Sequence, residues 1–279
     1  MDIEIIEMAE RKAKFILKNS SPAMANALRR TLLTDIPKMA IDKVEFHLGP
    51  IMGDTGKEYE SETPLFDEII AHRLGMVPVP TDLTLFGPQS ECSCRGEGCP
   101  NCTIMYSLNK IGPCTVYSGD LMPLGNPDLK VKDEFIPLVD LTDGQAILVY
   151  AHAVMGSART HVKWQVCNGV GYRYLTRITI DPDMASNEDV LKCADLAPEV
   201  FAVESGKLVV KCEHACDQSK PEIISIAENV KGIRFEYDDE NFFFKFETDG
   251  SLTARQALDE ALKILVAESN DFKNQIAAL

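Results

Sequence analysis

The sequence predicts an α+β fold in which both ends of the chain have the same kind of pattern and the middle is mostly β. Alternating apolar residues precede a helical pattern in residues 3–35 and again in residues 231–275. Short apolar and β-branched runs, separated by turn signals, fill residues 38–180. Neither end is long enough to bury its apolar face alone, so we expect the two ends to pack into one α+β layer.

The N-terminal segment predicts two strands and a helix. Apolar residues alternate within residues 3–17, which indicates two short strands joined by a polar turn. Ser21 fits the N-cap of a helix and Pro22 its first position. The helix should end near Asp35, because Pro37 disfavours a helical conformation in the residue before it. One face of this helix carries Met24, Ala27, Leu28, Thr31 and Leu32.

The middle of the chain predicts a mostly-β region with one helix. That helix should span residues 64–73, with Thr63 as its N-cap. The expected strands are residues 40–46, 77–79, 114–117, 146–153 and 161–166.

Four cysteines in the spacing C-x-C-x4-C-x2-C predict a metal site within this region. They are Cys92, Cys94, Cys99 and Cys102. Gly96 and Gly98 allow the sharp turns that would let four sulfur atoms converge on one ion. Four thiolates suit tetrahedral Zn²⁺ and leave no position for a water, so we expect a structural ion. An iron–sulfur cluster and a pair of disulfides are the alternatives.

The last hundred residues predict a small module, a hairpin and a long helix. In the module we expect a helix over residues 187–195, a turn at residues 204–206 and a strand over residues 207–210. Residues 231–247 alternate around an acidic turn, which predicts a hairpin with one buried face. Thr253 and Gln256 can form a capping box for a helix that runs toward residue 275. Its apolar side carries Leu258, Ala261, Leu262 and Leu265 and extends toward Phe272.

Composition excludes several classes of function. Asp and Glu number 43 against 28 Lys and Arg, and the net charge of −15 argues against broad contact with nucleic-acid phosphates. Neither a signal peptide nor a membrane span is expected, and nine cysteines without an export signal favour the reducing cytoplasm. The sequence contains no Gly-rich phosphate loop, Ser–His–Asp pattern or His-Glu-x-x-His motif.

Three segments carry a resemblance to a known family. The segment that begins Asn26-Ala-Leu-Arg-Arg and ends at Pro37 resembles the first helix of the assembly-platform subunit of cellular RNA polymerases. Residues 66–78 and residues 247–253 look like two further signatures of that family. The family includes bacterial α, its eukaryotic counterparts and the archaeal D subunit. The cysteine loop is similar to the zinc loop of some archaeal and eukaryotic members, so the chain is identified as a member of the archaeal, D-type branch.

The resemblance implies three domains and a set of partners. Residues 1–44 and 226–279 would form a discontinuous, α-like dimerisation domain, residues 45–168 an inserted mostly-β domain, and residues 169–225 a ferredoxin-like module. The chain would heterodimerise with the smaller subunit L. With subunits N and P, the pair would form the platform for the large catalytic subunits, and this chain would hold no catalytic residue. The two apolar helix faces would be the docking surface, although from the residues alone they could equally bury each other.

The module departs from the ferredoxin pattern. Residues 193–210 resemble half of a bacterial-type ferredoxin, but Ala197 stands where that pattern has a second cysteine. The cysteines that remain are Cys193, Cys212 and Cys216. A cubane cluster normally takes four thiolates, so we expect a cluster-free fold rather than a 4Fe–4S site. A cluster completed by His214, Asp217 or Cys167, and a disulfide within the trio, are the alternatives. A complete cluster would instead indicate an iron–sulfur electron-transfer or redox-sensing protein.

Overall fold

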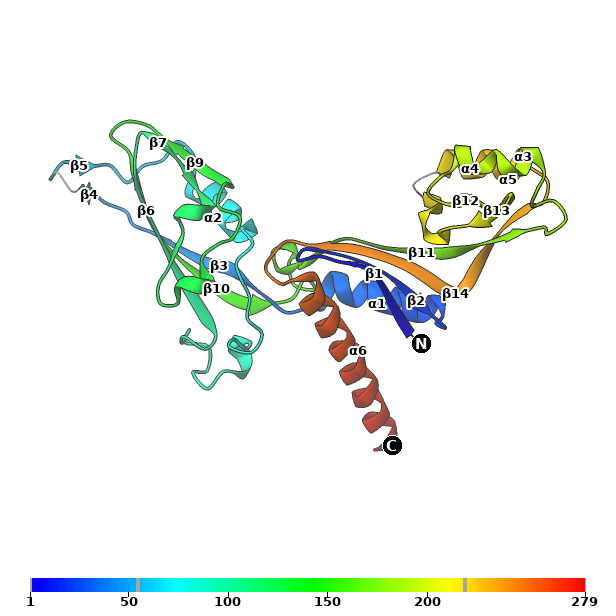
Figure 1. The fold of residues 1–279 in the computed structure, drawn as a ribbon. Coiled ribbons are helices and arrows are strands. Elements are labelled where there is room, and N and C mark those ends of the chain that lie inside the picture. The colour runs from blue at the N-terminus through cyan, green and yellow to red at the C-terminus, as the bar shows by residue number, and fades with distance from the viewer. Residues whose placement is uncertain (1, 54–55, 218–219, 279) are drawn as a thin grey trace. The chain divides into compact units, whose positions relative to one another are not determined.

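A computed structural model describes residues 2–53, 56–217 and 220–278 of the chain (Figure 1). The fold is mixed α+β with several sheets, as the sequence predicted. Its residues divide into two compact units. The first unit comprises Met1–Glu7, Lys14–Asn26 and Gly171–Lys245, and the second comprises Met8–Ala13, Ala27–Val170 and Phe246–Leu279. The three-domain boundaries expected from the sequence stay a prediction.

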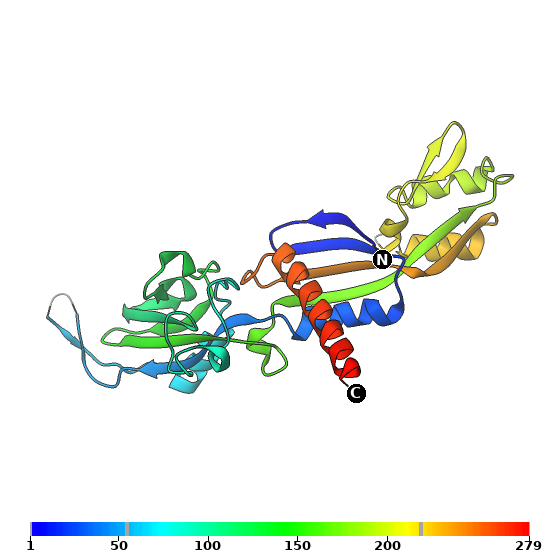
Figure 2. The same cartoon turned by 90° about the horizontal axis from the view of Figure 1, so that it is seen from below.

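A four-stranded sheet in the order β1-β2-β14-β11 runs for most of its length through the first unit, where its strands lie side by side (Figure 2). Its strands are β1 (Asp2–Met8), β2 (Lys12–Lys18), β11 (Cys167–Ile180) and β14 (Ile233–Thr248). Phe15 of β2 stacks on Phe244 of β14 with 5.0 Å between ring centroids, and Tyr172 of β11 stacks on Phe244 at 5.2 Å. These ring contacts join three strands. β1 and β2 confirm the two strands predicted at the N-terminus.

The predicted hairpin over residues 231–247 is wrong, because β14 is one continuous strand through the acidic segment. Asp238 accepts hydrogen bonds from the backbone N–H of Glu240 and the side-chain amide of Asn241, and it pairs with Arg177 of β11 at 2.6 Å. The acidic residue that suggested a turn is therefore held by neighbours along and across the strand. β14 changes direction part of the way along its length instead of reversing (Figure 1).

The small module of the first unit contains short helices and one hairpin. Its elements are α3 (Glu188–Leu191), α4 (Cys193–Leu196), β12 (Phe201–Glu204), β13 (Lys207–Val210) and α5 (Lys220–Asn229). The predicted helix over residues 187–195 is present as two pieces, and the predicted turn joins β12 to β13. Ser205 and Gly206 both have positive φ there, 52° and 76°, as a two-residue hairpin turn with the twist of its strands requires. The helix α5 was not predicted from the sequence.

The core of the module includes Val200, Phe201 and Leu208. Leu191 packs against it from a partly buried position, whereas Leu196 is exposed. Leu196 is the last residue of the short helix α4, and the buried residue that follows it is Ala197.

The second unit contains another four-stranded sheet, in the order β3-β10-β6-β8. Its strands are β3 (Lys38–Phe46), β10 (Ala146–Gly156), β6 (Thr103–Ile111) and β8 (Met122–Pro123). Tyr106 of β6 pairs with Ala151 of β10, and Leu108 with Val149, so all four side chains lie on one buried face. The helix α2 (Asp67–Met76) contributes to the same core. The remaining strands pair as β7 (Cys114–Tyr117) with β9 (Pro137–Leu141) and β4 (Ile51–Met52) with β5 (Glu58–Tyr59).

Two expected strands and one expected cap in this unit are wrong. Val77 and Val79 are buried but belong to no strand, because the prolines at 78 and 80 lack an N–H. Residues 161–166 hold a short 3₁₀ turn instead, stabilised where the His161 ring accepts the backbone N–H of Lys163. The Thr63 hydroxyl donates to the carbonyl of Leu65 and caps nothing, so α2 begins only at Asp67.

Two amphipathic helices, α1 (Pro22–Thr34) and α6 (Ala254–Ala277), begin and end close to the predicted positions. The Ser21 hydroxyl accepts the backbone N–H of Met24 at 3.3 Å, which confirms the predicted N-cap. Thr253 and Gln256 form the predicted capping box at the start of α6. None of the described helices is long and apolar enough to cross a lipid bilayer.

Candidate functional site

The four cysteines of the loop converge as the spacing predicted. Their sulfur atoms lie within 4.8 Å of one another. Cys92 and Cys99 are 3.4 Å apart at Sγ, Cys94 and Cys102 are 3.6 Å apart, and Cys99 and Cys102 are 3.9 Å apart. Four sulfurs about 2.3 Å from a tetrahedral zinc would be separated by about 3.8 Å, whereas a disulfide needs about 2.05 Å. The cluster can therefore hold a metal ion.

The backbone of the loop arranges the thiols. The carbonyl of Cys92 accepts the N–H of Arg95 at 3.0 Å, and Arg95 and Gly96 both have positive φ, at 56° and 88°. The backbone N–H of Cys99 lowers the pKa of the Cys94 thiol to about 5, because it stabilises the thiolate. Burial raises the pKa of the Cys102 thiol to about 11. Cys102 directly precedes β6, so the loop is attached to the sheet of the second unit.

The three cysteines of the module do not form a second cluster of this kind among the residues that the structure describes. Cys193 and Cys216 are buried in the apolar core, and burial raises the pKa of both thiols, that of Cys216 to about 11. The Sγ atom of Cys212 instead lies 3.1 Å from the Nε2 atom of His214. The side chain of Asp217 lies outside the described residues. Because, in the described part of the chain, these thiols do not converge as a group of three or more ligand atoms and two of them pack in the apolar core, the arrangement suits packing better than ligation.

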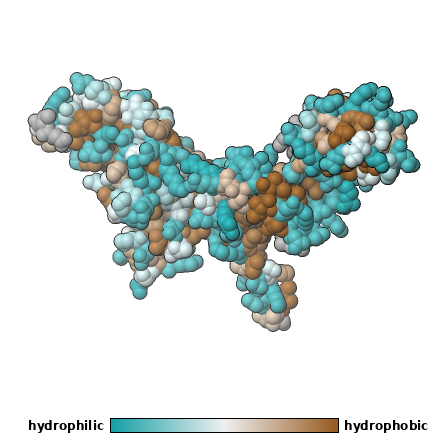
Figure 3. Space-filling model, viewed as in Figure 1, coloured by the Kyte–Doolittle hydropathy of each residue, from teal (hydrophilic) through white to brown (hydrophobic). Residues whose placement is uncertain are grey.

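The predicted docking residues divide by burial. Half of them are already buried in the isolated chain: Leu28, Thr31, Leu258 and Ala261. Ala27, Leu262 and Leu265 are half-buried, and Met24 is exposed. The part of α6 beyond Leu265 is exposed throughout, and it carries Val266, Phe272 and Ile276, with Phe272 66% exposed. Figure 3 shows apolar side chains on this helix among polar ones.

Val266 and Ile276 were not among the predicted docking residues. Val266 lies four residues after Leu262 and Ile276 eleven after Leu265, both helical spacings, so the periodicity contained the signal. The exposed residues Val266, Phe272 and Ile276 are called the α6 stripe below.

A groove of about 490 Å³ lies between the second half of α1 and α6. Arg159 closes one side of it, donating from Nε to Asp35 at 2.5 Å and from Nη2 to Glu268 at 3.4 Å. Its backbone N–H also donates to the carbonyl of Thr34 at 3.2 Å. One arginine therefore bridges the C-terminal end of α1 and the middle of α6 at the surface of the groove.

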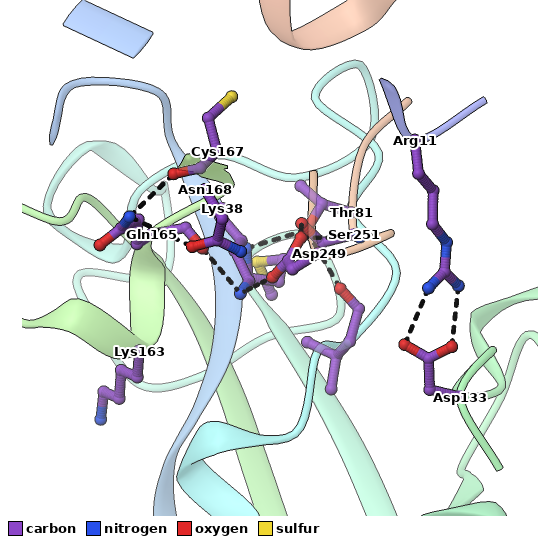
Figure 4. A network of polar contacts seen from close by, with 12 residues as sticks. Arg11, Lys38, Thr81, Asp133, Lys163, Gln165, Cys167, Asn168, Asp249 and Ser251 are labelled. Atoms are coloured by element: carbon purple, nitrogen blue, oxygen red, sulfur yellow. Dashed lines mark hydrogen bonds and ion pairs between the residues drawn. The ribbon is translucent and has the colours of Figure 1, made fainter. Parts of the chain in front are cut away.

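A buried polar network fixes where α6 begins (Figure 4). Lys38, the first residue of β3, donates to the carboxylate of Asp249 and to the carbonyl of Gln165. Asp249 also accepts hydrogen bonds from the backbone N–H and the hydroxyl of Ser251. The Thr81 hydroxyl accepts a hydrogen bond from the backbone N–H of Met39. The backbone N–H of Thr81 donates to the carbonyl of Ser251.

The turn between β1 and β2 also contacts the start of α6. Arg11 makes a bidentate pair with Asp133, at 3.0 and 2.9 Å, and the Glu10 carbonyl accepts the N–H of Ala254 at the start of α6. The Arg11 guanidinium fills the space that a side chain at Gly250 would need, so only glycine fits there at its φ of 91°. The segments that carried the family resemblance thus meet, or lie next to, one buried polar network.

Comparison with known proteins finds relatives that match nearly the whole chain. Residues 14–268 match the family described as the RNA polymerase Rpb3/Rpb11 dimerisation domain. The chain is 41% identical to the DNA-directed RNA polymerase subunit Rpo3 of Picrophilus torridus, over 99% of each chain. It is 42% identical to Rpo3 of Thermoplasma volcanium over 95% of this chain and 96% of that one. It is 36% identical to Rpo3 of Archaeoglobus fulgidus over 99% and 97%.

Proposed function

The chain belongs to the RNA polymerase Rpb3/Rpb11 dimerisation-domain family and is an assembly subunit of that enzyme, and we propose that it works as the archaeal D subunit. In this role it pairs with the smaller, α-like subunit L. With subunits N and P, the pair forms the platform on which the large catalytic subunits assemble. This chain contributes no catalytic residue and acts in the cytoplasm.

The α6 stripe is the observation that carries the proposal. The apolar side of the first half of α6 is buried or half-buried in the chain itself, but Val266, Phe272 and Ile276 are exposed on the second half. Apolar residues that continue a helical stripe into solvent mark a surface that a partner covers. Permanent interfaces of this kind bury more than about 2,000 Å² and resemble a domain core cut in half.

The cysteine loop, in this proposal, holds one structural Zn²⁺. The sulfur–sulfur distances of 3.4–3.9 Å bracket the edge expected for a zinc tetrahedron, and all four donors are thiols. The ion would neutralise four converging thiolates and order a loop whose own side chains are mostly exposed or half-buried.

The module has, in this proposal, a degenerate ferredoxin-like fold without a cluster. Burial of Cys193 and Cys216 in an apolar core supports this view, since both thiols fill space there. The alternative function, an iron–sulfur electron-transfer or redox-sensing protein, has no observation that favours it.

The heterodimer is tested by co-expression with a tagged α-like partner, followed by size-exclusion chromatography. Val266→Asp and Phe272→Asp place a carboxylate at the centre of the proposed contact, so each should weaken the heterodimer at least about tenfold. Both positions are exposed in the isolated chain, and the variants should therefore fold. Leu28→Asp is unsuitable, because Leu28 is buried within the protomer and its loss would unfold α1.

Lys263→Asp is the matched control. Lys263 lies on the same helix, is exposed, and among the described residues pairs with Glu260, at 3.1 Å and three residues away. Its replacement should leave the heterodimer intact. A stoichiometric heterodimer from both stripe variants would show that α6 is not the contact surface.

A further inference from the structure

A second groove, entirely within the first unit, lies between α5 and the strands β11 and β14. Its volume is about 540 Å³. Aromatic and aliphatic side chains dominate its lining, among them Tyr172, Tyr174, Phe235, Tyr237, Ile224 and Ala227. They come from β11 and from α5 and β14, which follow it by some 40 residues or more, so the fold builds this surface.

The rim of the groove carries large aromatic and aliphatic side chains that are exposed to solvent. Tyr237 is 81% exposed, and Ile224 and Tyr174 are exposed beside it. The sequence pattern placed Tyr237 on a buried face with Ile233 and Phe235, and it is the one member of that set left in solvent. Tyrosine supplies a large, stiff contact area with a polar tip, as residues that dominate binding surfaces do.

An acidic hollow of about 180 Å³ continues the groove along β14. Glu236 and Tyr237 line both, and Asp238, Asp239 and Glu240 line the hollow alone. Its single arginine, Arg177, is already paired with Asp238. Within the described ranges, no cation pairs with the carboxylates of Glu236, Asp239 or Glu240.

The other arginine of the groove is also engaged. Arg173 donates to the carbonyl of His214 at 2.5 Å, and its guanidinium lies 4.6 Å from the centre of the Phe243 ring. The surface therefore combines exposed aromatic anchors with three carboxylates that, among the described residues, lack a counter-charge.

We propose that this groove docks a basic peptide segment of a protein partner, with one or two apolar residues seated between Tyr174, Tyr237 and Ile224. The lysines or arginines that flank them would lie against Glu236, Asp239 and Glu240. Nucleic acid does not fit, because its phosphates would meet these carboxylates. A second copy of this chain does not fit either, since its net charge is −15. The inference is independent of the heterodimer described above.

Fluorescence anisotropy with labelled synthetic peptides tests the inference on the full chain. The probes are peptides of about ten residues, long enough when extended to cross the groove. The first carries lysines around a Leu-Trp pair, the second has the same charge with serines in place of Leu and Trp, and the third has glutamates in place of the lysines. We expect the first peptide to bind and the other two to bind at least about tenfold more weakly.

Variants locate the binding. Tyr237→Ser and Ile224→Ser should each weaken the first peptide about tenfold, and Glu236→Lys should weaken it by a factor that shrinks as salt is added. The matched controls are Val203→Ser and Glu204→Lys on β12, exposed positions of the same unit that line neither hollow. They should change the affinity less than about twofold. Equal binding of the serine peptide, equal loss in the controls, or no binding by the first peptide would each overturn the proposal.

Discussion

At the scale of single residues, Lys38 shows how one buried charge can organise a larger region. Its side chain is 3% exposed, and its ammonium reaches the carboxylate of Asp249 from the first position of β3. Asp249 in turn holds Ser251, two residues before the N-cap of α6. The pair therefore links the point where the chain leaves α1 to the point where α6 begins.

Removal of one partner from this pair should be costly. Lys38→Met leaves the Asp249 carboxylate buried without its counter-charge, and we expect the free energy of unfolding to fall by about 3–5 kcal/mol. Lys43→Met, at the exposed pair with Glu45, should change it by less than about 1 kcal/mol. Urea denaturation of the purified protein measures both. An equal, small change in the two variants would mean that the Lys38–Asp249 pair does not stabilise this region.

The cysteines of the module allow a second test with single residues. Cys193 and Cys216 fill apolar space, so Cys→Ala at both should cost about 1–2 kcal/mol, whereas Cys→Ser adds two buried hydroxyls and should cost more. Thermal unfolding compares the double variants, and iron and acid-labile sulfide are assayed in the wild type. If the wild type contained stoichiometric iron and the alanine variant lost it, these thiols would be cluster ligands and not packing residues.

At the scale of elements, the cysteine loop depends on its ion. It contributes Cys102 to the buried residues, but Cys92, Cys94 and Cys99 are only half-buried, so burial alone does little to order it. Cys99→Ser should lower the zinc content below one ion per chain and expose residues of about 86–104 to protease, while Cys114→Ser, outside the cluster, should change neither. Elemental analysis and limited proteolysis give the readout. A wild-type protein purified anaerobically without zinc would contradict the prediction.

The elements differ in how well the sequence predicts them. Caps and local spacing predicted α1, α6 and the convergence of four thiols, because these depend on neighbours within a few residues. The continuity of β14 was missed, since it depends on partners distant in sequence, whereas the 3₁₀ turn at Val162–Trp164 was missed although its hydrogen bonds join neighbouring residues. Arg177 lies 61 residues before the Asp238 that it holds, and no local pattern predicts that pair. The Lys38–Asp249 pair, 211 residues apart, was invisible for the same reason.

At the scale of the whole molecule, charge and apolar surface act in opposite directions. A net charge of −15 keeps copies of the chain apart at long range and opposes binding to nucleic acid. The α6 stripe attracts at short range, and salt weakens the repulsion between charges that lie farther apart than about 8 Å at physiological ionic strength. The balance between the two should therefore depend on salt and on whether a partner covers the stripe.

The chain expressed alone should consequently self-associate, and more strongly as salt is added, because screening weakens the repulsion and leaves apolar attraction intact. Light scattering after size-exclusion chromatography at about 0.05 and about 0.5 M salt would follow this. The double variant Val266→Asp/Phe272→Asp should stay monomeric at both, and the wild-type heterodimer should be insensitive to salt because its stripe is covered. If the isolated wild-type chain stays monomeric at high salt, the α6 stripe does not drive association, and the partner must bind elsewhere on the chain.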